Sequence, residues 1–68
     1  MNGNLGMNLK ILRLKKRLRQ KHVAKAIGVS RNAISNYERN SNVPKKSNLE
    51  KLAEFYGVSV EDITEEDI

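Results

Sequence analysis

Apolar residues recur along the chain mostly three and four positions apart, which is the spacing of amphipathic α-helices. No stretch of the sequence alternates apolar and polar residues as a half-buried β-strand does. The pattern therefore predicts an all-α fold, a compact bundle of five short helices joined by tight turns. The expected helices cover residues 8–16, 20–27, 30–39, 47–56 and 60–65.

Residues with known preferences for helix ends delimit these segments. Gly28 and Gly57 are expected just after helices, because glycine most easily adopts the left-handed conformation of a C-terminal cap. Ser30 and Ser59 are expected N-caps, whose hydroxyl oxygens accept a hydrogen bond from a first-turn amide. Ser47, with a glutamate three residues later, has the form of a capping box and predicts the start of the fourth helix. The two lysines before it could instead form an irregular first turn, which would move that start by up to two residues.

The length of 68 residues suits one small domain, close to the lower limit at which a single hydrophobic core suffices. Residues 1–7 contain two glycines and two asparagines, and we expect them to form a flexible, loop-like tail. Residues 8–68 are expected to form the single domain.

The segment 30–39 has an unusual polar face. On a helical wheel this face spans roughly 140°. It comprises the side chains of Arg31, Asn32, Ser35, Asn36 and Arg39. Ala33, Ile34 and Tyr37 lie on the opposite face and can pack against another helix. Arginine can bind guanine bidentately, asparagine can bind adenine, and serine can bind either, so such a face could recognise base edges in the major groove. Any surface helix has a polar face, however, so a merely solvated surface is the alternative.

Charge is distributed unevenly along the chain. Residues 1–46 contain 12 lysines and arginines and one acidic residue, a net charge of +11. Residues 47–68 contain one lysine and seven acidic residues, a net charge of −6. A basic lobe on a small chain favours nucleic acid as the partner, ahead of an anionic lipid surface, while simple solubility is the alternative.

Several classes of chemistry lack the residues that they need. The sequence has no cysteine, and a single histidine, His22, cannot build a metal or nucleophile site by itself. No apolar run approaches the roughly 20 residues of a membrane-spanning helix. We therefore expect no metal, no cofactor, no catalytic residue and no membrane association, and a cytoplasmic location. The chain is not expected to be an enzyme.

Residues 20–39, "QKHVAKAIGVSRNAISNYER", form a tight pair of helices of the helix-turn-helix type. Small Ala24 allows the two helices to approach each other, and Gly28 permits the turn between them. With the flanking segments "LKILRLKKRL" and "VPKKSNLEKLAEFYGVSVEDI", the chain resembles the Cro and phage-repressor (XRE-type) family of helix-turn-helix DNA-binding domains. The resemblance covers Leu9 to Ile63. Its most specific parts are the Gln-x-x-x-Ala-x-x-x-Gly core, the Ile34 position and the segment "LAEFYGVS".

This resemblance implies a five-helix bundle of the phage-repressor DNA-binding-domain type, whose third helix enters the major groove. The residues then expected to contact bases are Arg31, Asn32, Ser35 and Asn36. Phosphate contacts are expected from Gln20, Arg19, Ser30, Arg39, Asn40, Lys45 and Lys46. Arg13 and Glu38 correspond to an ion pair that joins the first helix to the end of the third, two solvated charges being the alternative.

Three residues depart from the family pattern, and none of them lies on the polar face of the third helix. Arg19 stands where a serine or threonine N-cap is common, and the loss of such a cap costs about 1 kcal/mol. Arg17 occupies a turn position often taken by glycine or asparagine, where we expect backbone strain. Lys46 replaces a frequent apolar anchor, which leaves the start of the fourth helix open.

The function implied by the resemblance is that of a sequence-specific double-stranded DNA-binding transcriptional regulator, with a repressor favoured over an activator. Because one helix covers few base pairs, we expect a homodimer on an inverted-repeat operator. The candidates for the dimer seam are Val58, Val60, Ile63 and Ile68. The alternatives are an antitoxin or another helix-turn-helix module that binds a protein partner, and, after these, an RNA-binding protein.

Overall fold

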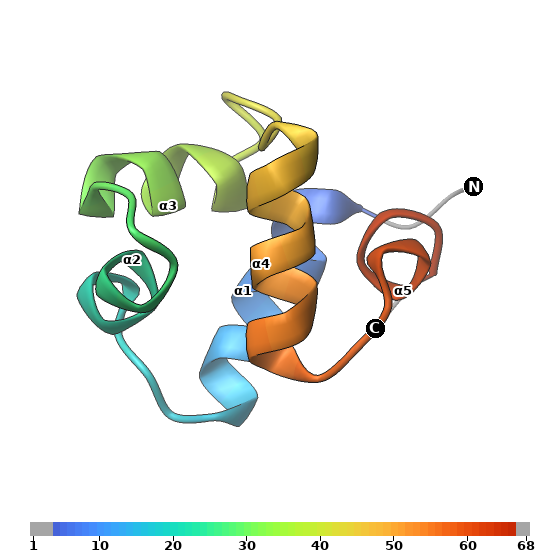
Figure 1. Cartoon of the computed structure of the whole chain (residues 1–68), viewed down its shortest axis with the longest axis horizontal. Helices are drawn as coiled ribbons and strands as arrows, with labels where there is room; N and C mark the ends of the chain where they lie inside the picture. Colours follow the sequence, from blue (N-terminus) through green and yellow to red (C-terminus); the bar gives the residue numbers. More distant parts are fainter. Residues whose placement is uncertain (1–3, 67–68) are drawn as a thin grey trace.

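Residues 4–66, the part of the chain that the computed structural model describes, form five α-helices and no strand. The helices are α1 (Leu5–Lys15), α2 (Gln20–Ile27), α3 (Arg31–Glu38), α4 (Lys46–Tyr56) and α5 (Val60–Thr64). Helices α1 and α4 occupy the centre of the molecule, with α2 and α3 on one side and α5 on the other (Figure 1). The predicted all-α five-helix class is confirmed.

All five helices contribute to one hydrophobic core. Its buried apolar residues are Leu9, Leu12, Val23, Ala24, Ile27, Ile34, Tyr37, Leu52, Ala53, Tyr56 and Ile63. Each fully buried aliphatic side chain stabilises the fold by roughly 1.5–3 kcal/mol relative to exposure. Because α3 is held by contacts with both α1 and α2, the core fixes which face of α3 is turned outward.

The helix ends follow local sequence signals. Gly28 and Gly57 have φ of 78° and 70°, the left-handed conformation predicted for them. Ser30 and Ser59 each accept a hydrogen bond at 3.0 Å from the amide three residues on. Both predicted N-caps are therefore confirmed. Arg17 has φ of 57°, so the predicted strain in the turn after α1 is also confirmed.

The N-terminal boundary differs from the prediction. Helix α1 begins at Leu5 instead of residue 8, because the side chain of Asn4 accepts a hydrogen bond from the Met7 amide at 2.9 Å and caps the helix. A β-carbon at Gly6 would lie 2.6 Å from the carbonyl oxygen of Glu38, so this glycine lets α1 pack directly against the end of α3. The predicted tail 1–7 is therefore wrong for residues 4–7, which cap and begin α1, while residues 1–3 lie outside the described residues.

The start of α4 is also corrected. The helix begins at Lys46, and Lys45 is its N-cap, without a hydrogen bond from its side chain. The capping box predicted at Ser47 is wrong, because Ser47 already lies inside the helix. Lys45 adopts an extended conformation after buried Pro44, and its carbonyl oxygen accepts the Leu49 amide at 2.9 Å. The irregular lysine start that the sequence left open is the one observed.

One residue of the predicted dimer seam is buried inside the monomer. Ile63 is 0% exposed and lies in the core. Ile63 is the one buried residue of α5, so the packing of this short helix against the bundle depends on it. Ile63 is therefore wrong as a seam residue. Val58 and Val60 are half-buried and pack against the core, and Ile68 lies outside the described residues.

Candidate nucleic-acid interface

The outward face of α3 carries the polar side chains that the helical wheel grouped together. Arg31 and Asn32 are exposed, and Ser35 and Asn36 are half-buried. On the opposite face Ile34 is 3% exposed. The orientation of this helix is thus as predicted, and α3 lies at the edge of the molecule (Figure 1). Whether these four side chains contact bases stays a prediction.

Helix α2 holds α3 in this orientation. Val23, Ala24 and Ile27 of α2 are buried in the core that α2 shares with α3. The left-handed Gly28 turns the chain after α2, and Ser30 caps the first turn of α3. The helix-turn-helix unit predicted over residues 20–39 is therefore present, with its second helix projecting outward.

A buried ion pair ties α1 to the end of α3. Arg13 donates to both carboxylate oxygens of Glu38, from Nε at 2.7 Å and from Nη2 at 3.0 Å. The two side chains are only 11% and 4% exposed, so the predicted pair is confirmed and is not solvated. Hydrogen bonding to Glu38 raises the pKa of the Arg13 guanidinium, although its burial acts in the opposite direction. Burial, together with the nearby charge of Glu38, also raises the pKa of Tyr56 to about 12.

The ion pair continues outward as a chain of hydrogen bonds to the polar face of α3. Gln20 Nε2 donates to Glu38 Oε1 at 3.1 Å, and Gln20 Oε1 accepts from Arg31 Nη1 at 3.3 Å. Because a primary amide has two N–H groups, one remains for the phosphate contact expected of Gln20. The link from Gln20 to Arg31 could not be seen in the sequence, since it depends on how α2 and α3 meet.

A separate hydrogen bond joins two residues of the polar face of α3 to each other. Arg39 Nη2 donates to Asn36 Oδ1 at 2.6 Å. Arg39 is exposed and is the C-cap of α3. The expected phosphate contact of Arg39 and the expected base contact of Asn36 therefore come from side chains that are already paired in the free protein.

The remaining expected phosphate ligands surround the ends of α2, α3 and α4. Arg19, Ser30, Lys45 and Lys46 are all exposed. Because Arg19 departs from the serine or threonine of the family pattern, its side chain is not expected to cap α2, and it does not. Instead His22 Nδ1 accepts a hydrogen bond from the Arg19 amide at 3.3 Å. The sequence interpretation missed this capping role of the single histidine.

Asn40 has a structural role that the sequence interpretation also missed. Its φ of 60° lies in the left-handed region, which asparagine tolerates better than most residues. Its Oδ1 accepts the Gly6 amide at 3.0 Å, and its Nδ2 donates to Asn4 Oδ1 at 2.9 Å. Asn40 therefore ties the loop after α3 to the start of α1. A phosphate contact from this side chain would have to use its other N–H.

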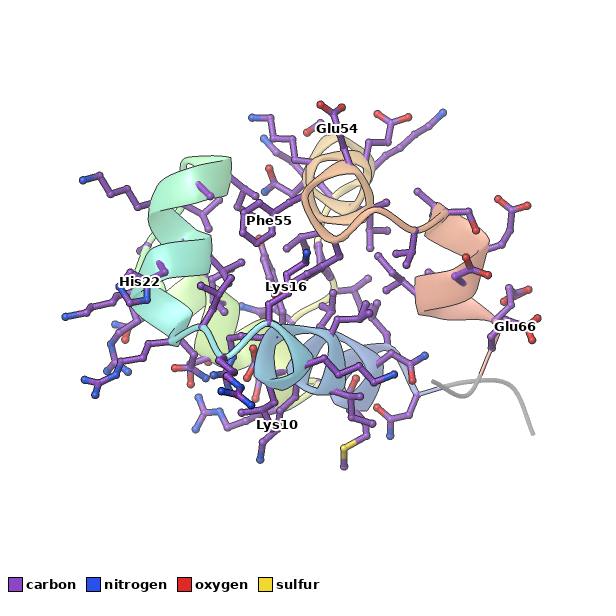
Figure 2. All side chains as sticks on the ribbon, turned by 90° about the horizontal axis from the view of Figure 1, so that it is seen from below. Lys10, Lys16, His22, Glu54, Phe55 and Glu66 are labelled. Atoms are coloured by element: carbon purple, nitrogen blue, oxygen red, sulfur yellow. The ribbon has the colours of Figure 1, made fainter. Side chains whose placement is uncertain are left out.

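Opposite charges lie at opposite ends of the molecule. Nitrogen-tipped side chains surround α2, where His22 is labelled, whereas carboxylates gather around α5, where Glu66 is labelled (Figure 2). Helix α5 has two acids in its first turn, Glu61 and Asp62, and α3 has none. The arrangement directs an anionic partner to the side of the molecule formed by α2 and α3.

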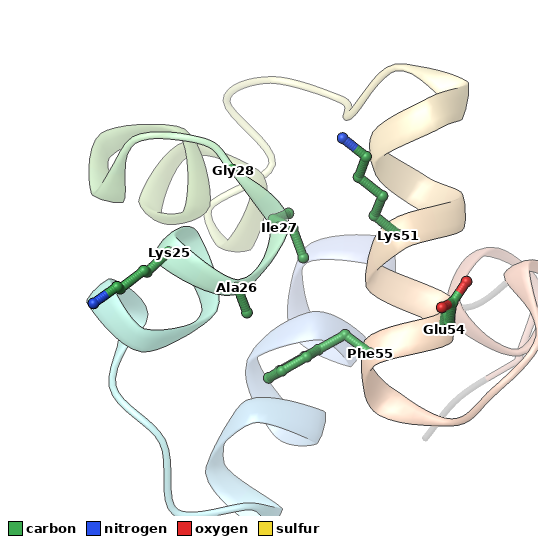
Figure 3. A pocket seen from close by; sticks show the side chains of 7 residues that line it. All are labelled: Lys25, Ala26, Ile27, Gly28, Lys51, Glu54 and Phe55. Atoms are coloured by element: carbon green, nitrogen blue, oxygen red, sulfur yellow. The ribbon is translucent and has the colours of Figure 1, made fainter.

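A shallow open pocket lies between the C-terminal end of α2 and α4 (Figure 3). It is lined by Lys25, Ala26, Ile27, Gly28, Lys51, Glu54 and Phe55. These residues include one carboxylate and two ammonium groups but no nucleophile paired with a base. Among the described residues, no group of three or more histidines and acids could hold a metal ion. Within residues 4–66, no helix has both the length and the apolar character required to cross a bilayer.

Comparisons with known proteins extend over most of the chain. A family model described as helix-turn-helix matches residues 9–63. The transcriptional repressor RstR of the cryptic phage CTXphi, from Vibrio cholerae, is 42% identical over 52 residues, which are 76% of this chain and 47% of RstR. The HTH-type transcriptional regulator ImmR of Bacillus subtilis (strain 168) is 38% identical over 58 residues, which are 85% of this chain and 46% of ImmR. The chain thus spans about half the length of these curated relatives.

The fold is also similar to that of a solved repressor. The P22 c2 repressor protein, in its crystal structure with synthetic operator 9T, superimposes with a TM-score of 0.85 and 32% sequence identity. The match covers 87% of this chain and 89% of the repressor chain. The similarity therefore extends well beyond α2 and α3.

Proposed function

Because the chain belongs to the helix-turn-helix family, we propose that it is a sequence-specific double-stranded DNA-binding transcriptional regulator, and specifically a repressor. The observation that carries this proposal is the outward face of α3, where Arg31, Asn32, Ser35 and Asn36 are held together by a buried opposite face. The similar proteins named above are a repressor, a regulator and a repressor solved with its operator, and none is an enzyme. Their resemblance supports the phage-repressor type of fold and of function.

In the proposed complex α3 enters the major groove, which is about 12 Å wide and admits one helix. The four outward side chains contact base edges and supply sequence specificity. The phosphate ligands are expected to be Arg19, Gln20, Ser30, Arg39, Lys45 and Lys46, with the free N–H of Asn40 as a further donor. These contacts supply the affinity and make it depend on salt concentration.

A single copy of α3 covers only a few base pairs, so we propose that two copies bind an inverted repeat with half-sites ~34 Å apart. With Ile63 excluded by its burial, Val58 and Val60 remain as seam candidates among the described residues. Binding to chromosomal or phage DNA of a bacterial cell places the protein in the cytoplasm.

The alternative is an antitoxin or another module that binds a protein partner. The observation that favours it is the exposed acidic surface of α5 and the residues after it, with Glu61, Asp62, Glu65 and Glu66. Helix α5 lies on the opposite side of the molecule from α3 (Figure 1). Co-purification of a cationic protein that does not compete with DNA would add this function to the proposed one. If a cationic protein co-purified and the chain bound no DNA at all, the partner-binding function would replace the proposed one.

Selection of bound sequences from random duplex DNA tests the proposal. We expect a palindromic consensus, which would report base recognition and two-fold symmetry together. Two variants form a matched pair. Arg31→Ala should lose base preference at one position in each half-site, whereas Lys45→Ala should weaken binding to all sequences alike. Failure to enrich any sequence at low salt would contradict the proposal.

A further inference from the structure

Asn36 and Arg39 lie one helical turn apart, at positions whose side chains are neighbours on a helix surface. Arg39 Nη2 donates to Asn36 Oδ1 over 2.6 Å, and the bond is charge-assisted because the guanidinium is ionised. A guanidinium has only N–H donors, so the atom of Asn36 that faces it must be the amide oxygen and not the amide nitrogen. The chemistry of Arg39 therefore fixes which way the Asn36 amide points.

The backbone around the pair is held in place. The carbonyl oxygen of Asn36 accepts hydrogen bonds from the amides of Ser41 and Asn42, at 2.9 and 3.3 Å. The turn that brings these amides back includes Asn40, whose side chain is bonded to the start of α1. Arg39 lies between these anchored residues, so both partners of the hydrogen bond start from a fixed backbone.

The hydrogen bond changes what Asn36 can recognise. A free asparagine binds adenine bidentately because its oxygen accepts from N6 while its nitrogen donates to N7. Arg39 takes one of the two lone pairs of the Asn36 oxygen and places its positive charge beside that oxygen, so the pair presents mainly N–H donors and positive potential to the groove. In the major groove guanine presents two acceptors, N7 and O6, which match a pair made of donors. Adenine presents a donor at N6, whose partially positive hydrogens are disfavoured beside the guanidinium of Arg39.

We propose that Arg39 is a positioning residue that sets the base read by Asn36, so that the pair selects guanine where Asn36 alone would select adenine. This inference rests on the proposed function, since it concerns the same face of α3. It differs from the role of phosphate ligand expected for Arg39. In a groove from which water is displaced, the positive charge of the pair interacts more favourably with the two guanine acceptors than with an adenine amine.

The test is selection of bound sequences with the wild type and the variants Arg39→Ala, Arg39→Lys and Lys45→Ala, with Asn36→Ala identifying the base position concerned. The wild type should select guanine at that position. Arg39→Ala removes this positive charge from the Asn36 oxygen and should shift the guanine-to-adenine ratio about tenfold towards adenine. Arg39→Lys keeps a charged donor and should retain guanine. Lys45→Ala should leave all base preferences unchanged.

Arg39 is exposed, so its variants should remain folded, which thermal melting verifies. A wild-type consensus with adenine at the Asn36 position would overturn the inference and leave the proposed function standing. The same would follow if Arg39→Ala weakened all sequences equally and lowered the salt dependence by about one phosphate contact. If the wild type selected no sequence, both the inference and the proposed function would be overturned.

Discussion

Helices α3 and α5 begin in the same way but carry surfaces of opposite charge. Each is short, is capped by a serine and turns apolar side chains into the core. Helix α5, however, has Glu61 and Asp62 in its first turn, whereas α3 has no acid there. The positive end of the α5 dipole is therefore compensated within the helix, and that of α3 is left for an external anion. First-turn chemistry, and not backbone geometry, separates a helix that can approach phosphate from one that repels it.

The largest expected effect on stability is that of replacing Ile63, the buried residue of α5. Ile63→Asp would place a charge in a fully buried position and should cost about 5 kcal/mol, close to the whole stability of a small domain. We expect the variant to be largely unfolded by circular dichroism. Val60→Asp, at a half-buried position of the same helix, is the matched control and should remain folded. An Ile63→Asp variant as stable as Val60→Asp would contradict the burial of this side chain.

The next largest effect concerns the Arg13–Glu38 ion pair, which ties α1 to the end of α3. Glu38→Gln removes the negative charge that faces buried Arg13 and should cost about 3 kcal/mol, since it leaves a charge without its partner. The urea midpoint should fall, and DNA binding should weaken as well, because Glu38 also holds Gln20. Glu50→Gln, at an exposed position, should change stability by less than about 0.5 kcal/mol. Equal midpoints for the two variants would show that the buried pair contributes nothing.

A matched pair of smaller changes compares the two helices directly. Ser30→Ala and Ser59→Ala each remove one N-cap hydrogen bond and should each cost about 1 kcal/mol of stability. Only Ser30→Ala should also weaken DNA binding, by about fivefold on all sequences, which corresponds to one lost hydrogen bond. The measurements are urea titration and a binding titration. An equal loss of DNA affinity in both variants would mean that the first turn of α3 does not contact phosphate.

The features predicted correctly from the sequence depend mainly on neighbours along the chain. The caps at Ser30 and Ser59 and the left-handed Gly28 involve residues within one turn, so their spacing is visible in the sequence. The polar face of α3 follows from helical periodicity alone. The Arg13–Glu38 pair is an exception, because it spans the fold and was expected only through the family resemblance.

The features that were missed depend on which distant segments meet. The sequence predicts Gly6 to be part of a flexible tail, although its missing side chain is what allows α1 to pack on α3. It predicts Asn40 to be a phosphate ligand but gives no sign of its bonds to residues 34 and 36 positions away. It does not predict the burial of Ile63, because a five-residue helix has too little periodicity to show its buried side.

The smallest expected effect tests the dipole argument in both directions. Glu61→Gln removes a first-turn acid from α5 and should cost about 0.5 kcal/mol, whereas Asn32→Asp adds one to α3 and should stabilise it by a similar amount. The more stable Asn32→Asp variant should nevertheless bind all DNA sequences more weakly, because its carboxylate repels phosphate. Asn32→Ala separates this repulsion from lost base recognition, since it should change preference at one base position only. If Asn32→Asp bound DNA as Asn32→Ala does, the open N-terminus of α3 would play no part in DNA affinity.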